Sequence, residues 1–356
     1  MNAEQRAHEL MLWFAGWLPD DVVAQCRSWL AEGRDELAVA VALRTYRGLG
    51  LPMSHEHAAA LNALHETAAD DYLHVDGESE PPYRFVRASA ETDTVATKAA
   101  RRLPGFRALW AVWRLPASAS LWASARRVYL MEVGDVVQAP EIAARMQRVL
   151  LDAGEISAQV EVFGPDTDLP PYQTTALLEA VEIAALHPAP PPRLAQVFDF
   201  PQAAVPFAVD HPRIDAVEER QSILDYLDTG HLLLAIGSAE PDVVESQRGE
   251  VVPLGLRTDG SWIWSDASAY YLREHHLAPD SALLEHIGRE SGRSIELSRA
   301  AWHRAMTMLR EPDRTRGSQD DRGPRNDSGS RNDRDSSLRP YRRDDADLAD
   351  RGTGAQ

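Results

Sequence analysis

Three aspartates follow two apolar segments that have the character of buried strands. Asp135 comes shortly after residues 128–133, and Asp166 and Asp168 lie in the turn that follows residues 158–163. If these strands are parallel neighbours, both loops meet at the carboxyl edge of the sheet, where open α/β sheets bind ligands. Carboxylate oxygens gathered there suit Mg²⁺ or Ca²⁺. The three residues predict a divalent-metal site, and the alternative is that they serve only as turn and helix-cap residues.

Four aromatic residues form a second candidate site. Trp262 and Trp264 alternate with Ile263, so in a strand both rings lie on one face, and Tyr270 and Tyr271 follow on the next helix. Tryptophan and tyrosine often anchor protein interfaces. The four residues predict an aromatic patch that binds a protein partner. The alternative is that the hairpin packs its tryptophans onto that helix.

The histidines and the cysteine do not form a metal or nucleophile motif. His55 and His57 are two residues apart on a predicted helix and point in different directions, as do the neighbours His275 and His276. Cys26 is the only cysteine, which excludes an intrachain disulfide and a thiolate zinc cluster. It falls on an apolar helix face, where it acts as a small core residue. Phosphate-loop, dinucleotide-binding, nucleophile-elbow and zinc-protease motifs are absent.

Residues 1–75 predict a module of four short helices. Apolar residues recur along the first helix at the spacing of one buried face. Pro19 opens the second helix with two aspartates in its first turn. The third helix ends at Gly48, and Ser54 caps a fourth helix over about 55–70.

Residues 76–187 predict an α/β module. Its clearest unit is a strand, a helix and a strand over 128–133, 141–153 and 158–163, the pattern of a right-handed crossover between parallel strands. Further elements are expected at about 83–87 (a strand) and at 94–103, 106–115 and 173–186 (helices).

A proline-rich linker at 188–193 precedes an α+β module at 194–310. The strongest signal there is Asp259-Gly260, a two-residue hairpin turn between apolar runs. A strand is expected at 231–236, and helices at 215–227, 267–276, 280–290 and 297–310. The predicted fold class is α+β, with an N-terminal helical bundle, two small α/β modules, a β-α-β crossover and a C-terminal β-hairpin with helices.

Residues 311–356 have the composition of a disordered tail. They hold ten arginines and eleven acidic residues, with few large apolar side chains. Such a segment cannot bury enough surface to offset its loss of conformational entropy on folding.

Several segments resemble those of an uncharacterised actinobacterial protein family. They are the run from Val252 to Trp264 (Val-Pro-Leu-Gly-Leu-Arg-Thr-Asp-Gly-Ser-Trp-Ile-Trp), the Tyr-Tyr-Leu-Arg-Glu-His that begins at Tyr270, and the Ala-Pro-Asp that begins at Ala278. The resemblance implies a bacterial cytoplasmic protein and attaches no activity to it.

The charge balance narrows the classes of partner. A net charge of −18 disfavours binding to nucleic acid or to an anionic membrane surface, because both need clustered cations. No run of about 18 apolar residues and no signal peptide are present, so we expect a cytoplasmic protein. An acidic surface steers the approach of a basic protein partner.

These observations predict a non-enzymatic interaction protein, of adaptor, regulatory or neutralising type, that needs no cofactor. The alternative is a hydrolase or transferase that uses Asp135, Asp166 and Asp168 to hold Mg²⁺ or Ca²⁺. A third hypothesis is a small-molecule sensor with a cleft between the two mixed modules.

Overall fold

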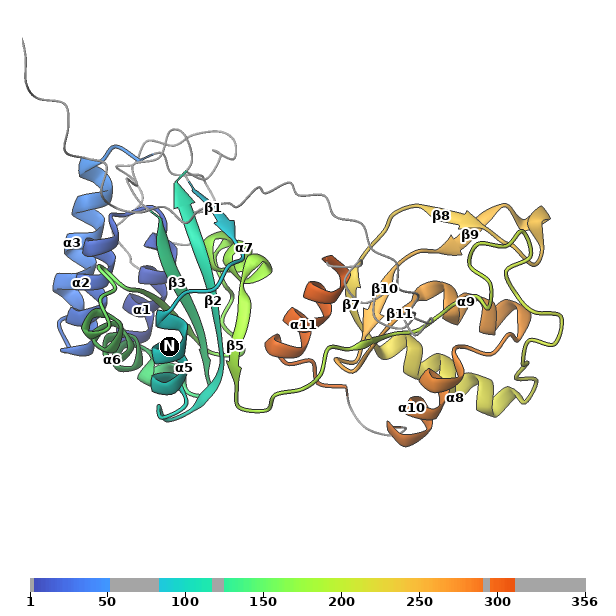
Figure 1. Cartoon of the computed structure of the whole chain (residues 1–356). Coiled ribbons are helices and arrows are strands. Elements are labelled where there is room, and N and C mark those ends of the chain that lie inside the picture. Colours follow the sequence, from blue (N-terminus) through green and yellow to red (C-terminus); the bar gives the residue numbers. More distant parts are fainter. Residues whose placement is uncertain (1–2, 52–82, 117–124, 291–294, 311–356) are drawn as a thin grey trace, which may run out of the picture. The chain divides into compact units, whose positions relative to one another are not determined.

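The structure is a computed structural model that describes residues 3–51, 83–116, 125–290 and 295–310. All of these residues belong to one unit, which spans Met1–Pro312. The fold is α+β with helices at the N-terminus, as the sequence predicts (Figure 1). Within the described ranges, no helix combines the length and the apolar character needed to cross a membrane.

Three N-terminal helices pack around the first hydrophobic cluster. They are α1 (Ala3–Phe14), α2 (Asp20–Ala31) and α3 (Asp35–Gly48). Each buries one apolar stripe, as the periodicity predicts, and Cys26 is fully buried beside Leu30 in this cluster. The fourth predicted helix, at 55–70, lies outside the described residues.

A five-stranded sheet forms the centre of the next part of the chain. Its strands are β1 (Tyr83–Val86), β2 (Phe106–Pro116), β3 (Arg126–Val133), β4 (Gln159–Phe163) and β5 (Val181–Ala185). Their order is β1-β2-β3-β4, and β5 also pairs with β2. The strands β3 and β4 are parallel and are joined through the short 3₁₀ helix η1 (Val136–Gln138) and α6 (Ala139–Asp152), which confirms the predicted crossover.

Two helix predictions in this region are wrong. Residues 106–115 form the central strand β2, whose side chains are buried on both faces, so the alternation that marks a half-buried strand is missing. The helix expected at 173–186 is α7 (Pro171–Glu179), which ends before an extended Ala180. The chain then continues as β5, whose first residue Val181 is β-branched and favours a strand.

Helices cover both faces of this sheet (Figure 1). On one face, α5 (Thr92–Ala100) and α6 pack against Met131 and Val160. On the other face, α1 and α7 pack over Trp110 and Phe163. The N-terminal helices and the sheet therefore share an interior.

A buried polar layer joins α1 and α2 to the sheet. The fully buried Arg27 and Glu161 lie 2.5 Å apart (Nη2 to Oε2), and Gln173 donates to the same carboxylate oxygen at 2.9 Å. His8 donates from Nε2 to the Val162 carbonyl oxygen at 2.7 Å, and burial, helped by the charge of Arg27, lowers the pKa of His8 to about 4. A buried charge that loses its partner lowers the stability of the fold. These contacts therefore hold α1 and α2 at one position on β4.

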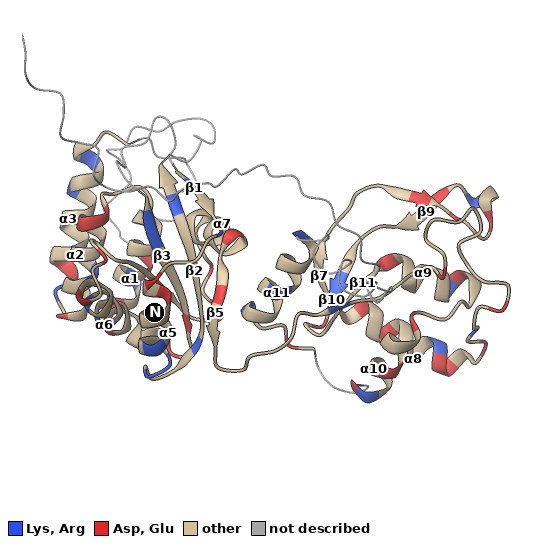
Figure 2. Ribbon diagram, viewed as in Figure 1, with Lys and Arg blue, Asp and Glu red and all other residues tan. Residues whose placement is uncertain are grey.

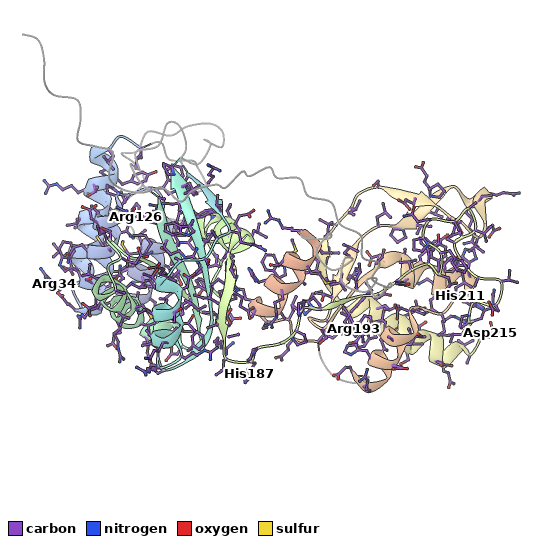
Figure 3. The ribbon with its side chains drawn as sticks, viewed as in Figure 1. Arg34, Arg126, His187, Arg193, His211 and Asp215 are labelled. Carbon is purple, nitrogen blue, oxygen red and sulfur yellow. The ribbon has the colours of Figure 1, made fainter. Side chains whose placement is uncertain are left out.

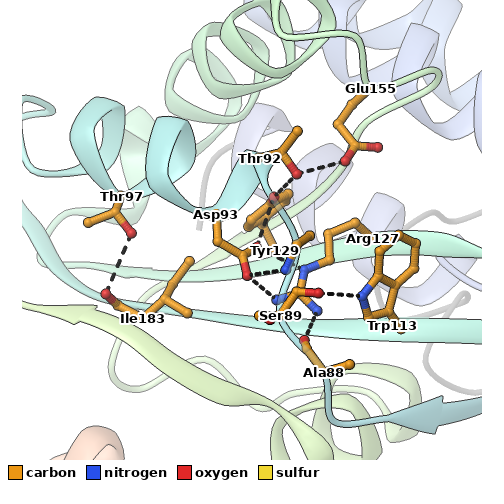
Figure 4. A network of polar contacts seen from close by, with 11 residues as sticks. Ala88, Ser89, Thr92, Asp93, Thr97, Trp113, Arg127, Tyr129, Glu155 and Ile183 are labelled. Carbon is orange, nitrogen blue, oxygen red and sulfur yellow. Dashed lines mark hydrogen bonds and ion pairs between the residues drawn. The ribbon is translucent and has the colours of Figure 1, made fainter. Parts of the chain in front are cut away.

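A second polar network fastens the start of α5 to β3 (Figure 4). Arg127 donates to both carboxylate oxygens of Asp93, at 2.9 and 2.7 Å, and to the Ala88 carbonyl at 2.7 Å. The Tyr129 hydroxyl donates to Thr92 at 2.8 Å. The connection between β1 and α5 is therefore held by side chains of β3.

Residues 193–290 form the C-terminal module. Its main sheet has the order β6-β11-β10-β7, with β6 (Arg193–Leu194), β7 (His231–Leu234), β10 (Leu256–Thr258) and β11 (Trp262–Ser265). A separate ribbon pairs β8 (Ala239–Pro241) with β9 (Glu250–Pro253), and the short η2 (Ser246–Arg248) lies between them. The helices of the module are α8 (Val217–Thr229), α9 (Asp266–His275) and α10 (Ser281–Glu290).

The hairpin predicted at Asp259-Gly260 is confirmed by the antiparallel pairing of β10 and β11. Asp259 Oδ1 accepts the backbone N–H groups of Ser261 and Trp262, each at 2.7 Å. Gly260 has a φ of +92°, a left-handed conformation that glycine adopts without strain.

The helix α11 (Arg299–Arg310) packs against elements that precede the proline-rich linker. The buried His303 donates from Nε2 to the Ala180 carbonyl at 3.2 Å, and Arg304 lies 3.2 Å from the Glu182 carboxylate. Burial lowers the pKa of His303 to about 4. The chain thus returns from the C-terminal module to the first sheet, where its last described helix packs against α7 and β5.

Candidate functional site

The predicted metal ligands lie at one edge of the first sheet without converging on an ion site. Asp135 Oδ1 accepts the Val137 N–H at 3.0 Å and thereby caps η1. Asp166 and Asp168 lie in the turn after β4, at the same edge. Across the described part of the chain, no three His, Cys, Asp or Glu side chains come close enough together to hold a metal ion.

Two arginines lie beside Glu132 at this edge. Glu132 is 3% exposed, and burial raises its pKa, an effect that Arg299 and Arg107 oppose. Arg299 Nε lies 3.6 Å from Glu132, and its Nη2 donates to the carbonyls of Pro165 and Thr167, both at 3.0 Å. Arg299 therefore faces Glu132, and Asp166 and Asp168 also act on its charge.

A cavity of about 360 Å³ lies next to Arg299. Its walls include the apolar residues Leu177, Leu297 and Trp302 and the polar residues His231 and Arg299. His231 Nε2 donates to the Ile295 carbonyl at 3.0 Å. Arg299 Nε is buried and has no hydrogen-bond partner among the described residues.

The four predicted aromatic binding residues lie in or against the core of the C-terminal module. Trp262 and Trp264 are 5% and 0% exposed, and Trp264 Nε1 donates to the Leu227 carbonyl of α8 at 3.2 Å. Tyr271 is buried, and the hydroxyl of the half-buried Tyr270 donates to Asp242 at 2.9 Å. Their aromatic surface is used to hold the hairpin and α8–α9 together.

Four histidines of this module each form a pair with an aspartate. The pairs, with their N–O distances, are His211–Asp199 at 2.8 Å, His275–Asp242 at 2.6 Å, His276–Asp215 at 3.1 Å and His286–Asp259 at 2.5 Å. Figure 3 labels His211 and Asp215, one member each of two of these pairs. The adjacent His275 and His276 bind different aspartates, as expected for side chains that diverge. Burial acts to raise the pKa of Asp242, but the N–H groups of Glu245 and Val244, with His275 and Tyr270, lower it to about 2. His55 and His57 lie outside the described residues.

The exposed apolar surface is concentrated in the C-terminal module. Eighteen large apolar side chains are exposed among the described residues, and eleven of them fall between Leu194 and Val251. These eleven are Leu194, Phe200, Val205, Val209, Val217, Leu232, Leu234, Ile236, Val243, Val244 and Val251. They lie on several elements, with Leu194 on β6 and Leu232 and Leu234 on β7, at opposite ends of the sheet. Exposed apolar side chains in such number are a common mark of a protein-binding region.

The strand β7 lies at the centre of this stretch of sequence and at the end of its sheet. Leu232, Leu234 and Ile236 are 52%, 44% and 40% exposed. The sequence predicts this strand, but its continuous apolar run is typical of a buried one. The signal that reveals an edge is the order of strands, which places β10 on one side of β7 and no described strand on the other.

The same module carries more than half of the net charge of the chain. Residues 193–290 contain seventeen Asp and Glu and seven Arg, a net charge of −10 out of −18. Acidic segments are visible on the β8–β9 ribbon in Figure 2. A partner that binds the exposed apolar side chains of this module therefore approaches through a negative field.

Comparisons with protein-family models, with curated proteins and with solved structures found no match.

Proposed function

We propose that this chain is a non-enzymatic interaction protein, of adaptor, regulatory or neutralising type, that binds a protein partner on its C-terminal module. The observation that carries the proposal is the set of eleven exposed apolar side chains between Leu194 and Val251. Apolar surface gains about 25 cal/mol per Å² when it leaves water, so a complementary partner is held by burying these side chains. We call its members on and directly after β7, Leu232, Leu234 and Ile236, the apolar face.

The acidity of the module supports a basic partner. With seventeen acidic residues against seven arginines, residues 193–290 attract a positively charged protein and accelerate its association. The proposal includes a bacterial cytoplasmic setting, which the resemblance to actinobacterial segments supports. The metal-dependent hydrolase or transferase has less support, because Arg299 and Arg107 already face Glu132 at the edge where Asp135, Asp166 and Asp168 lie.

Position-specific crosslinking in the native cells tests the proposal. A photoreactive phenylalanine analogue is placed at Leu234 on the apolar face, and in a matched variant at Leu151, which is 61% exposed on α6. We expect a covalent adduct with a second protein from position 234 and not from position 151. Absence of an adduct at 234, or equal adducts at both positions, would overturn the proposal.

A further inference from the structure

We propose that the buried polar layer that joins α1 and α2 to the sheet is an internal binding site for water molecules. Four elements meet in this layer, and α1, α2, β4 and α7 supply His8, Arg27, Glu161 and Gln173. The inference is independent of the proposed function, because it concerns the interior of the first sheet and its helices. It follows from polar atoms of these four side chains that no other residue satisfies.

The layer holds a high concentration of unpartnered buried polar atoms. Thirteen buried side-chain nitrogen and oxygen atoms lack a hydrogen-bond partner among the described residues, and five of them belong to this layer. The five are Nδ1 of His8, Nε and Nη1 of Arg27, Oε1 of Glu161 and Oε1 of Gln173. All four residues are at most 1% exposed, so bulk solvent does not reach these atoms. Buried polar atoms are nearly always paired, either with the protein or with ordered water.

The contacts that the layer does make hold these atoms in one small region. Glu161 Oε2 accepts from Arg27 Nη2 at 2.5 Å and from Gln173 Nε2 at 2.9 Å. The unpartnered Oε1 belongs to the same carboxylate and therefore lies beside both of these side chains. His8 donates to the carbonyl of Val162, the next residue of β4, and burial and the nearby charge of Arg27 both lower the pKa of His8.

The existing bonds fix which unpartnered atoms donate and which accept. His8 Nε2 faces a carbonyl oxygen and carries the ring proton, so Nδ1 of the neutral ring is an acceptor. The Gln173 amide donates its N–H groups to the Leu12 carbonyl and to Glu161, so its Oε1 is an acceptor. The Nε and Nη1 atoms of Arg27 carry three N–H groups and can only donate, and Glu161 Oε1 can only accept. The layer therefore offers three N–H donors and three acceptor atoms.

This mixture of donors and acceptors identifies water as the ligand. An anion bound to the N–H groups of Arg27 would lie against the acceptor atoms of Glu161 and His8, and a cation would lie against the Arg27 guanidinium. Water both donates and accepts. A buried water makes about three hydrogen bonds, so three donors and three acceptors suit about two waters. These waters link α1, α2 and α7 to β4, in addition to the direct contacts.

Water–protein Overhauser spectra of the isotope-labelled full chain test the inference. The reporter is the Nε–H group of Arg27. The matched control is Arg127, a second buried arginine, whose three side-chain nitrogens all donate to Asp93 or to the Ala88 carbonyl. We expect a cross peak to water at Arg27, with opposite signs in the NOE and ROE spectra, and none at Arg127. Opposite signs mark a long-lived water, since exchange of the N–H proton with bulk water gives the same sign in both spectra.

Oxygen-17 relaxation dispersion then counts the long-lived waters. The test variant is Arg27→Met with Glu161→Leu, which removes the three donors and one acceptor. The control variant is Arg127→Met with Asp93→Leu, which removes a buried pair of the same kind whose arginine is fully hydrogen-bonded. We expect the test variant to lose about two long-lived waters and the control variant to lose none. Circular dichroism establishes that each variant is folded, and the Arg27 cross peak of the parent protein decides the question if a variant is not.

Several results would overturn the inference. One is the absence of a water cross peak at Arg27, and another is an equal cross peak at Arg127. A third is the same number of long-lived waters in the parent protein and in the folded test variant. Stabilisation of the parent protein by chloride, lost in the test variant, would also overturn the inference, because the ligand would then be an anion.

Discussion

Replacing His8 with glutamine tests the buried polar layer beneath α1. His8 is 1% exposed, and burial lowers its pKa to about 4, against 6.5 for an unperturbed histidine. The unfolded chain therefore takes up a proton at higher pH than the folded chain does. For this reason His8 destabilises the fold progressively as the pH falls from 6.5 toward 4. The linkage relation gives a loss of about 2 kcal/mol at pH 5 and about 3 kcal/mol below pH 4.

The assay is urea unfolding of the full chain at pH 8 and pH 5, followed by circular dichroism. We expect the loss of unfolding free energy between these two values to be smaller by about 2 kcal/mol in His8→Gln than in the parent protein. Glutamine retains a hydrogen-bond donor for the Val162 carbonyl, so the comparison measures only the effect of protonating His8. His187→Gln, at an exposed position, is the control. An unchanged pH dependence in His8→Gln would refute the reasoning.

Three further predictions concern stability. Glu161→Gln should lower the free energy of unfolding by about 3–5 kcal/mol because Arg27 loses its buried charged partner. The double variant Arg27→Met with Glu161→Leu should lose far less. Equal losses for the two variants in urea unfolding would contradict this prediction. In Gly230→Ala the new methyl group overlaps the Trp264 ring and should lower the free energy of unfolding by about 1–3 kcal/mol. In Gly237→Ala the methyl group enters open space, and the change should stay within about 0.5 kcal/mol; thermal unfolding compares the two variants. A chain that ends before α11 should unfold at a clearly lower temperature, and an unchanged midpoint would show that α11 adds nothing to the first sheet.

The elements that the sequence predicts well depend on short-range patterns. The crossover through α6 follows from two apolar strands on either side of an amphipathic helix. The hairpin at Asp259-Gly260 follows from turn chemistry, because aspartate caps the turn and glycine supplies the left-handed residue. Spacing also places Trp262 and Trp264 on one face, and both belong to the same buried cluster.

The features that cannot be predicted from the sequence depend on contacts between residues far apart in the chain. The strand β2 is apolar on both faces because helices cover both, among them α5 on one face and α1 on the other. Its periodicity therefore does not distinguish a strand from a buried helix. The tryptophan face is buried because α8, about 35 residues earlier, packs over it. Likewise Arg299 reaches the acidic edge from more than 130 residues away. No sequence feature near Asp166 predicts that Arg299 lies close to it.

The location of the binding surface is also a tertiary property. An uncharged apolar run such as residues 231–236 is equally suited to the middle of a sheet and to its edge. Only the order β6-β11-β10-β7 shows that Leu232 and Leu234 end the sheet. Because Leu232 and Leu234 are also exposed, the predicted strand is a candidate interface.

Crosslinking from Leu234 in the native cells tests the central claim most directly. The account predicts one dominant adduct at this position, with the crosslink mapping to a basic protein, and a weaker yield when Leu232 is replaced by lysine. An adduct that forms equally from Leu151 on α6, or no adduct from Leu234, would contradict the claim that β7 and its apolar face bind a protein partner.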